Sequence, residues 1–286
     1  RSRVLTIKSK LDARLNDFSA SERRIALVVA ERYPVSALGG IEDLARQAKV
    51  SPPTVTRFVR HLGYARFADF QRDVRQEVQD AESSPLALMQ RHQEAPPETG
   101  LLSDIATSIG SLENDATTNS LELAAKMIRG TKGRVFAVGG RWTSVLAQYL
   151  TFQLGTMREE VHALLPMASG IAMDRLVDLN RRDIMIICDV RRYQPDLYAI
   201  AEIVRQQKVR IILFTDVELS PICELAEVTI PAPVATSSPL DTLAPMVAAA
   251  DKLLGFLVEA YGETATQRIR RLEKVRTKIA GSVSGA

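Results

Sequence analysis

Cysteine and histidine are both scarce in this sequence of 286 residues, which contains two cysteines and three histidines. Neither Cys188 nor Cys223 lies in a Cys-x-x-Cys pair, and two lone thiols indicate a reducing compartment rather than a disulfide framework. His92 and His162 have no partner at the spacing that a metal site needs. We therefore expect no metal site and no bound cofactor.

Long apolar runs are also missing. The longest stretch, residues 243–258, contains Pro245 and is interrupted by Asp251 and Lys252. It is too short and too polar to span a bilayer. The first eight residues, Arg-Ser-Arg-Val-Leu-Thr-Ile-Lys, lack the apolar core of a signal peptide. These absences predict a cytoplasmic protein without a membrane partner.

The length and the distribution of charge favour two domains of different character. A chain of 286 residues is long for one domain and fits two. Residues 1–78 hold 15 Lys and Arg against 9 Asp and Glu, a net charge of +6, whereas residues 79–286 hold 22 against 25, a net of −3. A basic excess confined to the front of the chain is expected where that part meets a polyanion.

Helical patterns fill the first 80 residues. Ser19 and Glu22 have the spacing of a capping box at a helix start. Gly39-Gly40 separates this helix from the next one, Ile41–Ala48, and further helices are predicted from Ser51 and over Arg66–Gln79. Polar, Pro-rich segments follow and predict a linker over 81–100. The domains expected are therefore a helical one at 1–80 and a second one at 101–286, whose roles follow from the motifs below.

The segment Ile41–Leu62 has the pattern of a helix-turn-helix. Ala45 provides the small residue that two crossing helices need, and Pro52 stands at the first position of the second helix, after the capping residue Ser51. Lys49 occupies the turn position that many such motifs give to a left-handed glycine. The apolar anchors are Leu44, Ala48, Val50, Val55, Phe58 and Leu62.

The remaining face of the second helix is polar and includes two arginines. Short hydroxyls and guanidinium groups near a helix N-terminus suit contacts in the major groove. The DNA-binding residues predicted are Ser51, Pro53, Thr54, Thr56, Arg57, Arg60 and His61. The alternative is a helical hairpin whose polar face is only solvated.

Beyond residue 130, short apolar runs alternate with helical patterns. The strands predicted are Arg134–Val138, Val161–Leu165, Ile184–Cys188, Val209–Phe214 and Glu227–Ile230. Helices are expected near 143–155, 169–179, 196–207 and 219–226, with more before 130 and after 238. This alternation predicts an α-β-α sandwich of the flavodoxin type with a five-stranded parallel sheet. The fold class is thus α/β overall, with an all-α domain in front.

Four segments resemble one family of bacterial regulators. They are Phe18-Ser-Ala-Ser-Glu-Arg, Ile41-Glu-Asp-Leu-Ala, Val50-Ser-Pro-Pro-Thr-Val-Thr-Arg-Phe and Leu62-Gly-Tyr-Ala-Arg-Phe-Ala-Asp-Phe. Together they resemble the N-terminal helix-turn-helix domain of the RpiR family. The resemblance implies that a SIS (sugar isomerase) domain, an α/β sandwich that binds phosphosugars, follows it.

The SIS resemblance places an effector site at the carboxyl edge of the sheet, where parallel α/β folds bind ligands. The family's Gly-rich turn corresponds to Gly139, Gly140, Arg141, Thr143 and Ser144, and its Ser-x-Ser-Gly-x-Thr loop corresponds to a segment with Asp189, Arg191, Arg192 and Gln194. Arg141 and the second segment depart from the family pattern. We expect Ser237 and Ser238, at the start of the last long helix, to face the same edge.

Two interpretations of Arg191 and Arg192 stay open. Their guanidinium groups replace hydroxyls as ligands of a phosphate or carboxylate, or they pair with Asp189 or a neighbouring subunit around an empty pocket. The leading hypothesis is a DNA-binding transcriptional regulator, a homodimer or homotetramer, that senses a small anionic metabolite. The alternatives are a regulator with a vestigial pocket and a sugar-phosphate isomerase with an extra helical domain. No catalytic residue is predicted, because no Glu or His is placed in these loops to act as a general base.

Overall fold

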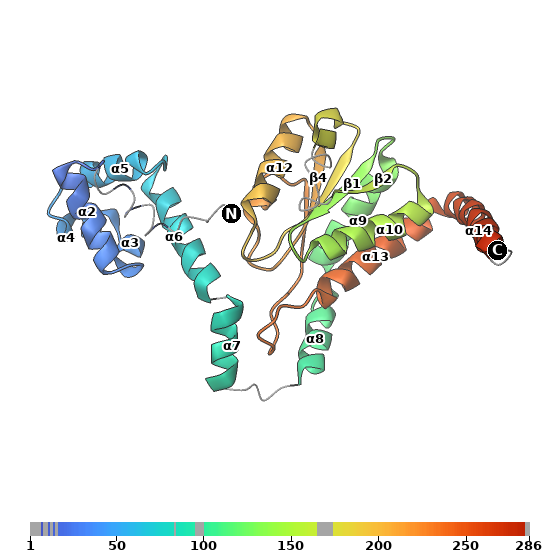
Figure 1. Ribbon diagram of the computed structural model, residues 1–286, viewed down its shortest axis with the longest axis horizontal. Helices are drawn as coiled ribbons and strands as arrows, with labels where there is room; N and C mark the ends of the chain where they lie inside the picture. Colours follow the sequence, from blue (N-terminus) through green and yellow to red (C-terminus); the bar gives the residue numbers. More distant parts are fainter. Residues whose placement is uncertain are drawn as a thin grey trace. The chain divides into compact units, whose positions relative to one another are not determined.

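The computed structural model describes residues 7, 11, 14, 17–82, 84–94, 100–164 and 174–283. The chain folds into two compact units, Arg1–Gln90 and Arg91–Ala286 (Figure 1). Each unit has its own hydrophobic core. They are described separately below.

The described part of the first unit is helical. Its helices are α2 (Ala20–Glu31), α3 (Val35–Leu38), α4 (Ile41–Gln47), α5 (Pro52–His61), α6 (Phe67–Glu82) and the start of α7 (Pro85–Glu94). The capping box is confirmed, because the Ser19 hydroxyl accepts from the Glu22 backbone N–H and the Glu22 carboxylate accepts from the Ser19 N–H. Gly39 ends α3 and Gly40 begins α4, as the glycine pair predicted. The short helix α3 was not predicted.

One core holds these helices together. Ile25 of α2, Leu44 of α4, Phe58 of α5 and Phe70 of α6 are all fully buried in it. The predicted anchors Leu44, Ala48, Val55 and Phe58 are buried, while Val50 and Leu62 pack against the cluster from its edge. Lys49 has a φ of 52°, which confirms the left-handed turn between α4 and α5. The helix-turn-helix geometry therefore follows from the pattern of the sequence.

The second unit contains the predicted five-stranded sheet. Its strands are β1 (Val135–Gly139), β2 (Val161–Leu164), β3 (Ile184–Cys188), β4 (Arg210–Thr215) and β5 (Val228–Pro231). All pairings are parallel, in the order β2-β1-β3-β4-β5. Leu165, which was predicted as the end of the second strand, lies outside the described residues. Parallel order requires a crossover between successive strands, and these crossovers form the outer layers.

Helices cover both faces of this sheet (Figure 1). The second unit also contains the C-terminal end of α7. Its other described helices are α8 (Leu101–Gly110), α9 (Asp115–Gly130), α10 (Ser144–Met157), η1 (Arg175–Asp178), α12 (Pro195–Gln206), η2 (Pro221–Glu224), α13 (Ala244–Tyr261) and α14 (Glu263–Val283). Helices α9, α10 and α13 contribute to one core cluster with the sheet, and η1, α12 and η2 to the other.

Alternate strand residues supply these two cores. Val135 and Ala137 of β1 point to the side of α9 and α10, whereas Phe136 and Val138 point to the side of α12. Because both faces are buried, the strands are apolar without alternation, which is typical of parallel sheets. The continuous run Ile184–Cys188 is buried at every position.

Two expectations for the helices need correction. The element predicted near 219–226 is only the short 3-10 helix η2. Of the helix predicted near 169–179, residues 169–173 lie outside the described residues, and the described part contains the 3-10 helix η1. The helix expected to start at Ser237 begins at Ala244 instead, and a separate helix, α14, follows it. Met246, Leu253 and Leu257 of α13 are buried in the domain core. None of the described helices combines the length and apolar content of a membrane span.

Phe58→Ala is expected to destabilise the first unit by about 3–5 kcal/mol, because it removes a fully buried ring and leaves a cavity. Urea unfolding followed by circular dichroism measures the loss. Leu27→Ala is the control on α2, where the side chain is 53% exposed and little change is expected. Equal losses in the two variants would contradict this account of the core. Fluorescence of Trp142, in the second unit, should keep its midpoint in both.

Candidate functional site

Helix α5 presents most of the predicted DNA-binding residues to solvent. Pro53, Arg57 and Arg60 are exposed, and Thr56 is half-buried. The Arg57 guanidinium donates to the Thr54 hydroxyl at 3.3 Å, and the Thr56 hydroxyl donates to the Pro52 carbonyl at 3.3 Å. These residues form one solvent-facing surface, which we call the α5 face: Pro53, Thr56, Arg57 and Arg60.

Three other predicted residues have structural partners. Thr54 is only 9% exposed and packs toward the core, so its placement on the outer face was wrong. Ser51 stands at the N-cap position, but its hydroxyl lies 2.9 Å from that of Thr54 and makes no cap hydrogen bond. His61 is exposed, and its Nδ1 lies 3.2 Å from the Glu22 carboxylate on α2. These contacts fix the ends of α5.

At the carboxyl edge of the sheet, the turn after β1 is held by one hydroxyl. Thr143 accepts from the Gly140 N–H at 2.7 Å and donates to the Cys188 carbonyl at the end of β3, also at 2.7 Å. A Cβ on Gly139 would lie 2.4 Å from the Thr143 carbonyl oxygen, so only glycine fits. The predicted Gly-rich turn therefore forms, but the Thr143 hydroxyl is buried and engaged within the protein. Arg141 is exposed, and Ser144 is half-buried beside it.

Asp189 lies at the end of β3 and is buried rather than open to a ligand. It is 2% exposed, and its two oxygens accept from the Ser220 hydroxyl at 2.6 Å and the Gln194 N–H at 3.3 Å. Burial raises the pKa of the Asp189 carboxyl to about 7; the two hydrogen bonds oppose the rise, and the nearby Asp216 adds to it. The side chain of Gln194 packs against Gly140.

Arg191 and Arg192 converge on a carboxylate that was not predicted, Asp241. Arg191 donates to both Asp241 oxygens, through Nη2 and through Nε at 3.2 Å, and Arg192 Nη2 donates to Oδ2 at 3.0 Å. The Asp241 side chain is 3% exposed, that of Arg191 11% and that of Arg192 31%. Of the partners that the sequence left open, Asp189 is not the one these contacts show: the carboxylate comes from the loop before α13. We call this group the Arg191–Asp241 cluster.

Asp216 supports the same loop from the end of β4. It is 1% exposed, accepts from the Arg191 N–H and the Glu218 N–H, and accepts from the Tyr193 hydroxyl at 2.8 Å. Sequence reasoning missed it, although an acid directly after a buried parallel strand was a signal. Sequence reasoning missed Asp241 as well, although it selected the nearby Ser237 and Ser238 as site residues.

Ser237 and Ser238 lie in the loop before α13. The Ser237 N–H donates to Asp104 of α8 at 3.0 Å, and the Ser238 hydroxyl accepts from the Leu240 N–H at 3.2 Å. The first contact ties the loop that carries Asp241 to α8, and the second forms a local turn within that loop. Within the described residues, no group of three or more His, Cys, Asp and Glu side chains is arranged to hold a metal ion.

Comparison with known proteins now gives both units a family context. The model of the helix-turn-helix domain of the rpiR family matches residues 5–81, and the model of the SIS domain matches residues 127–254. The chain belongs to the RpiR family. It is a helix-turn-helix regulator with a SIS domain, as the sequence resemblance predicted.

Relatives of this RpiR-family chain are distant in sequence. A regulator of Providencia stuartii, described as an uncharacterized HTH-type transcriptional regulator in the aarA 3' region, is 22% identical over 232 residues, which cover 79% of this chain and 80% of the relative. The sugar isomerase domain of the RpiR transcription factor from Sphaerobacter thermophilus is 20% identical with a TM-score of 0.56, covering 61% of this chain and 96% of that one. The NanR protein of Vibrio vulnificus, solved with ManNAc-6P, is 18% identical with a TM-score of 0.51, covering 94% and 97%. The two structures show a shared fold.

The RpiR-family chain is expected to lose stability as pH rises from about 4 to about 7, because the buried Asp189 carboxyl loses its proton over this range. Its folded pKa, about 7, exceeds the value of about 3.9 in an unfolded chain. In this window the folded state binds the proton more tightly, so folding becomes less favourable as that proton is lost. Asp189→Asn should flatten this part of the profile, which thermal unfolding at pH 5 and pH 8 measures. The control Asp174→Asn, at an exposed position, should keep the wild-type pH dependence, and a wild-type dependence in Asp189→Asn would contradict the assignment.

Proposed function

We propose that helix α5 reads the major groove of an operator through the α5 face. The observation that carries this proposal is a set of exposed polar residues on the second helix of an rpiR-family helix-turn-helix whose opposite side is fully buried. Arg57 and Arg60 supply guanidinium forks that match the O6 and N7 acceptors of guanine or the phosphates beside it. Pro53 and Thr56 offer the small contacts that base edges accept.

Arg57→Ala is expected to weaken operator binding by about 1–3 kcal/mol if Arg57 contacts a base. An operator fragment, selected from random duplexes with the wild-type protein, is titrated by fluorescence anisotropy. Arg24→Ala removes the same charge from an exposed position on α2 and should leave specific binding nearly unchanged. If Arg57→Ala binds the operator like the wild type, Arg57 does not belong to the recognition surface.

A symmetric oligomer follows from the same proposal, because helix-turn-helix domains usually bind two half-sites as a pair. The second unit leaves large apolar side chains uncovered on its outer helices, including Val145 and Phe152 of α10, at 62% and 67% exposure, and Val258 of α13 at 56%. Exposed apolar side chains of this size favour contact with a second copy. A homodimer or homotetramer remains the expected state.

We infer that the effector is a small anion, phosphosugar-like or carboxylate, that engages the Arg191–Asp241 cluster. Two guanidinium groups already hold one carboxylate there, which supports an anion site, since guanidinium pairs bind carboxylates and phosphates alike. A ligand anion competes with Asp241 for the same donors. The complex of Vibrio vulnificus NanR with ManNAc-6P supports a sugar phosphate as the first class to test.

The same ion pairs favour a second candidate, a regulator whose pocket is vestigial. In that case Asp241 satisfies both arginines permanently and no metabolite binds. An isomerase is less well supported, because the best-placed acid among the described residues of the carboxyl edge is not free to act as a general base: Asp189 is buried and both of its oxygens accept hydrogen bonds. We therefore propose a regulator without catalytic activity.

Substitutions on the two sides of the ion pair are expected to act in opposite directions. Arg191→Ala with Arg192→Ala should weaken anion binding about ten- to a hundred-fold, whereas Asp241→Asn should strengthen it by removing the internal competitor. Calorimetric titration with ManNAc-6P, and with citrate as a carboxylate, measures both. Arg205→Ala, at an exposed position on α12, is the control.

Three outcomes separate the candidates. Opposite shifts support the effector site. Absence of heat with every variant, Asp241→Asn included, favours the vestigial pocket. Turnover of a sugar phosphate that is lost in the double variant favours the isomerase.

A further inference from the structure

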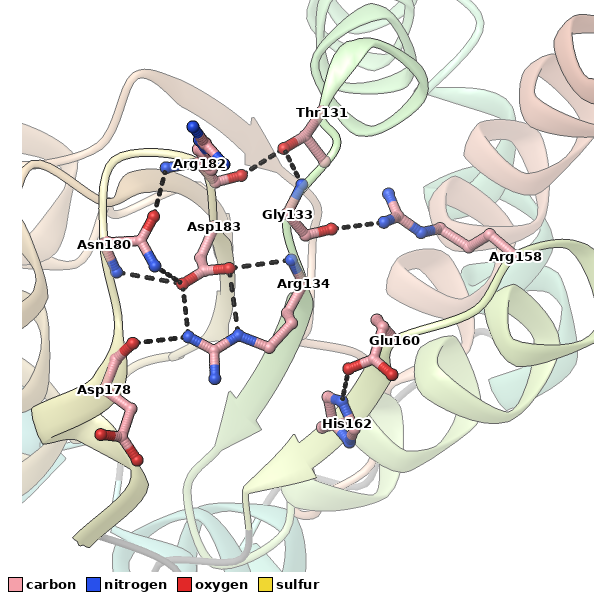
Figure 2. Close-up of polar contacts among 10 residues, drawn as sticks. All are labelled: Thr131, Gly133, Arg134, Arg158, Glu160, His162, Asp178, Asn180, Arg182 and Asp183. Carbon is pink, nitrogen blue, oxygen red and sulfur yellow. Dashed lines mark hydrogen bonds and ion pairs between the residues drawn. The ribbon is translucent and has the colours of Figure 1, made fainter.

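A concave surface lies at the amino edge of the sheet, where the strands begin, opposite the edge that carries the Arg191–Asp241 cluster. It is an open groove of about 730 Å³ between three loops, which lead into β1, β3 and β4, neighbours in the sheet. The loops are residues 131–134, 180–183 and 207–209, and Figure 2 shows contacts of the first two. This amino-edge groove belongs to the second unit alone and is separate from the Arg191–Asp241 cluster.

A buried ion pair holds the first two loops together. Asp183 is 1% exposed and accepts from Arg134 through its backbone N–H, Nε and Nη2, at 2.8, 3.2 and 2.8 Å. It also accepts from the backbone and side-chain N–H groups of Asn180, at 3.0 and 3.1 Å. Burial alone raises the pKa of the Asp183 carboxyl, but the hydrogen bonds from Arg134 and Asn180 outweigh it and hold that pKa below its ordinary value. The carboxylate thus stays charged and the wall of the groove is fixed (Figure 2).

Two further contacts close the gap between these loops. The Thr131 hydroxyl donates to the Arg182 carbonyl and accepts from the Gly133 N–H at 3.1 Å. A Cβ on Gly133 would lie 2.1 Å from the Arg182 carbonyl oxygen, so the loops approach as closely as backbone permits. The side chains that project from this frame are therefore presented at fixed positions.

Four cations line the groove without a partner. Lys132, Arg181, Arg182 and Lys208 are exposed, and no described residue forms an ion pair or hydrogen bond with their charged groups. Arg134, by contrast, is neutralised by Asp183. The only other acid in the lining is Glu160, which lies 3.2 Å from His162. The groove is thus strongly positive, although residues 79–286 have a net charge of −3.

The chemistry of the lining points to phosphate rather than to a ring or an apolar group. The described lining residues are all polar, charged or glycine, so the groove offers no aromatic ring on which a base can stack. Its open form suits an extended polyanion better than an enclosed small molecule. Unpaired Lys and Arg side chains stand on three separate loops, so the groove offers several cations to an extended chain of phosphates.

We propose that the amino-edge groove binds the phosphate backbone of duplex DNA, independently of sequence. The chain already carries a helix-turn-helix, so a second DNA contact on the same polypeptide forms at a high effective concentration. Backbone contacts of this kind add affinity and sensitivity to salt without adding specificity. The SIS-domain unit thereby takes part in DNA binding directly.

The test is the salt dependence of binding to a 60-base-pair duplex of mixed sequence, measured by anisotropy with the full chain. Lys132→Gln, Arg181→Gln and Lys208→Gln are combined, which removes one cation from each loop and leaves the Arg134–Asp183 pair intact. Each lost phosphate contact lowers the slope of log K against log salt by about 0.9. The slope of the triple variant should therefore be shallower by about 2–3, and its binding weaker at low salt.

A matched control separates position from net charge. Lys126→Gln, Arg175→Gln and Arg205→Gln also remove three cations from exposed positions of the second unit, but away from the groove. This control should keep a slope within about one of the wild type. Equal slopes for the groove variant and the control would overturn the proposal, whether both match the wild type or both fall.

A further arm separates this proposal from the role of α5. Arg57→Ala with Arg60→Ala should abolish preference for the selected operator while the groove cations still contribute their 2–3 to the slope on mixed-sequence DNA. Loss of the groove contribution in that background would show that the groove does not bind DNA by itself, and would overturn the proposal while leaving the operator-binding function of α5 intact.

Discussion

The burial of the parallel sheet on both faces is the constraint on which the chemistry of the second unit depends. Strands β1, β3 and β4 are apolar along almost their whole length because helices cover each side. Polar and charged groups therefore gather where the strands end or begin. The Arg191–Asp241 cluster lies at the edge where the strands end, and the amino-edge groove lies at the edge where they begin. The same core fixes the positions of both, since each loop is anchored by a buried strand residue.

The two edges differ in how their charges are balanced. At the carboxyl edge, Arg191 and Arg192 share Asp241, and Asp189 and Asp216 are buried beneath them with hydrogen bonds to hydroxyl and N–H groups. At the amino edge, one acid, Asp183, neutralises one arginine and leaves four cations exposed. Arginines that are already paired within the protein bind an external anion only if it displaces their carboxylate. Unpaired cations attract anions without such a displacement, and salt screens that attraction.

Much of the fold was predictable because local patterns determined it. The capping box at Ser19, the turn at Lys49 and the apolar run Ile184–Cys188 each depend on residues close in sequence, and each was confirmed. The partner of Arg191 was not predictable in this way. Asp241 lies 50 residues away, and only the packed sheet brings it to the loop. Thr54 was placed on the wrong face of α5 for a different reason: a threonine at the edge of a helix face fits either the core or the solvent.

The internal carboxylate also sets a condition on the proposed effector. Asp241 is part of the chain, so its contact with the two arginines costs no loss of translational freedom, whereas a free metabolite must offset that loss. A monocarboxylate offers the arginines nothing that Asp241 lacks. A phosphate dianion carries a second charge and a third acceptor oxygen, and can engage Arg191 and Arg192 together while Asp241 turns away. If the pocket is a working sensor, a phosphorylated ligand is therefore favoured over a simple carboxylate, and displacement of Asp241 is the step by which binding reaches the loop before α13.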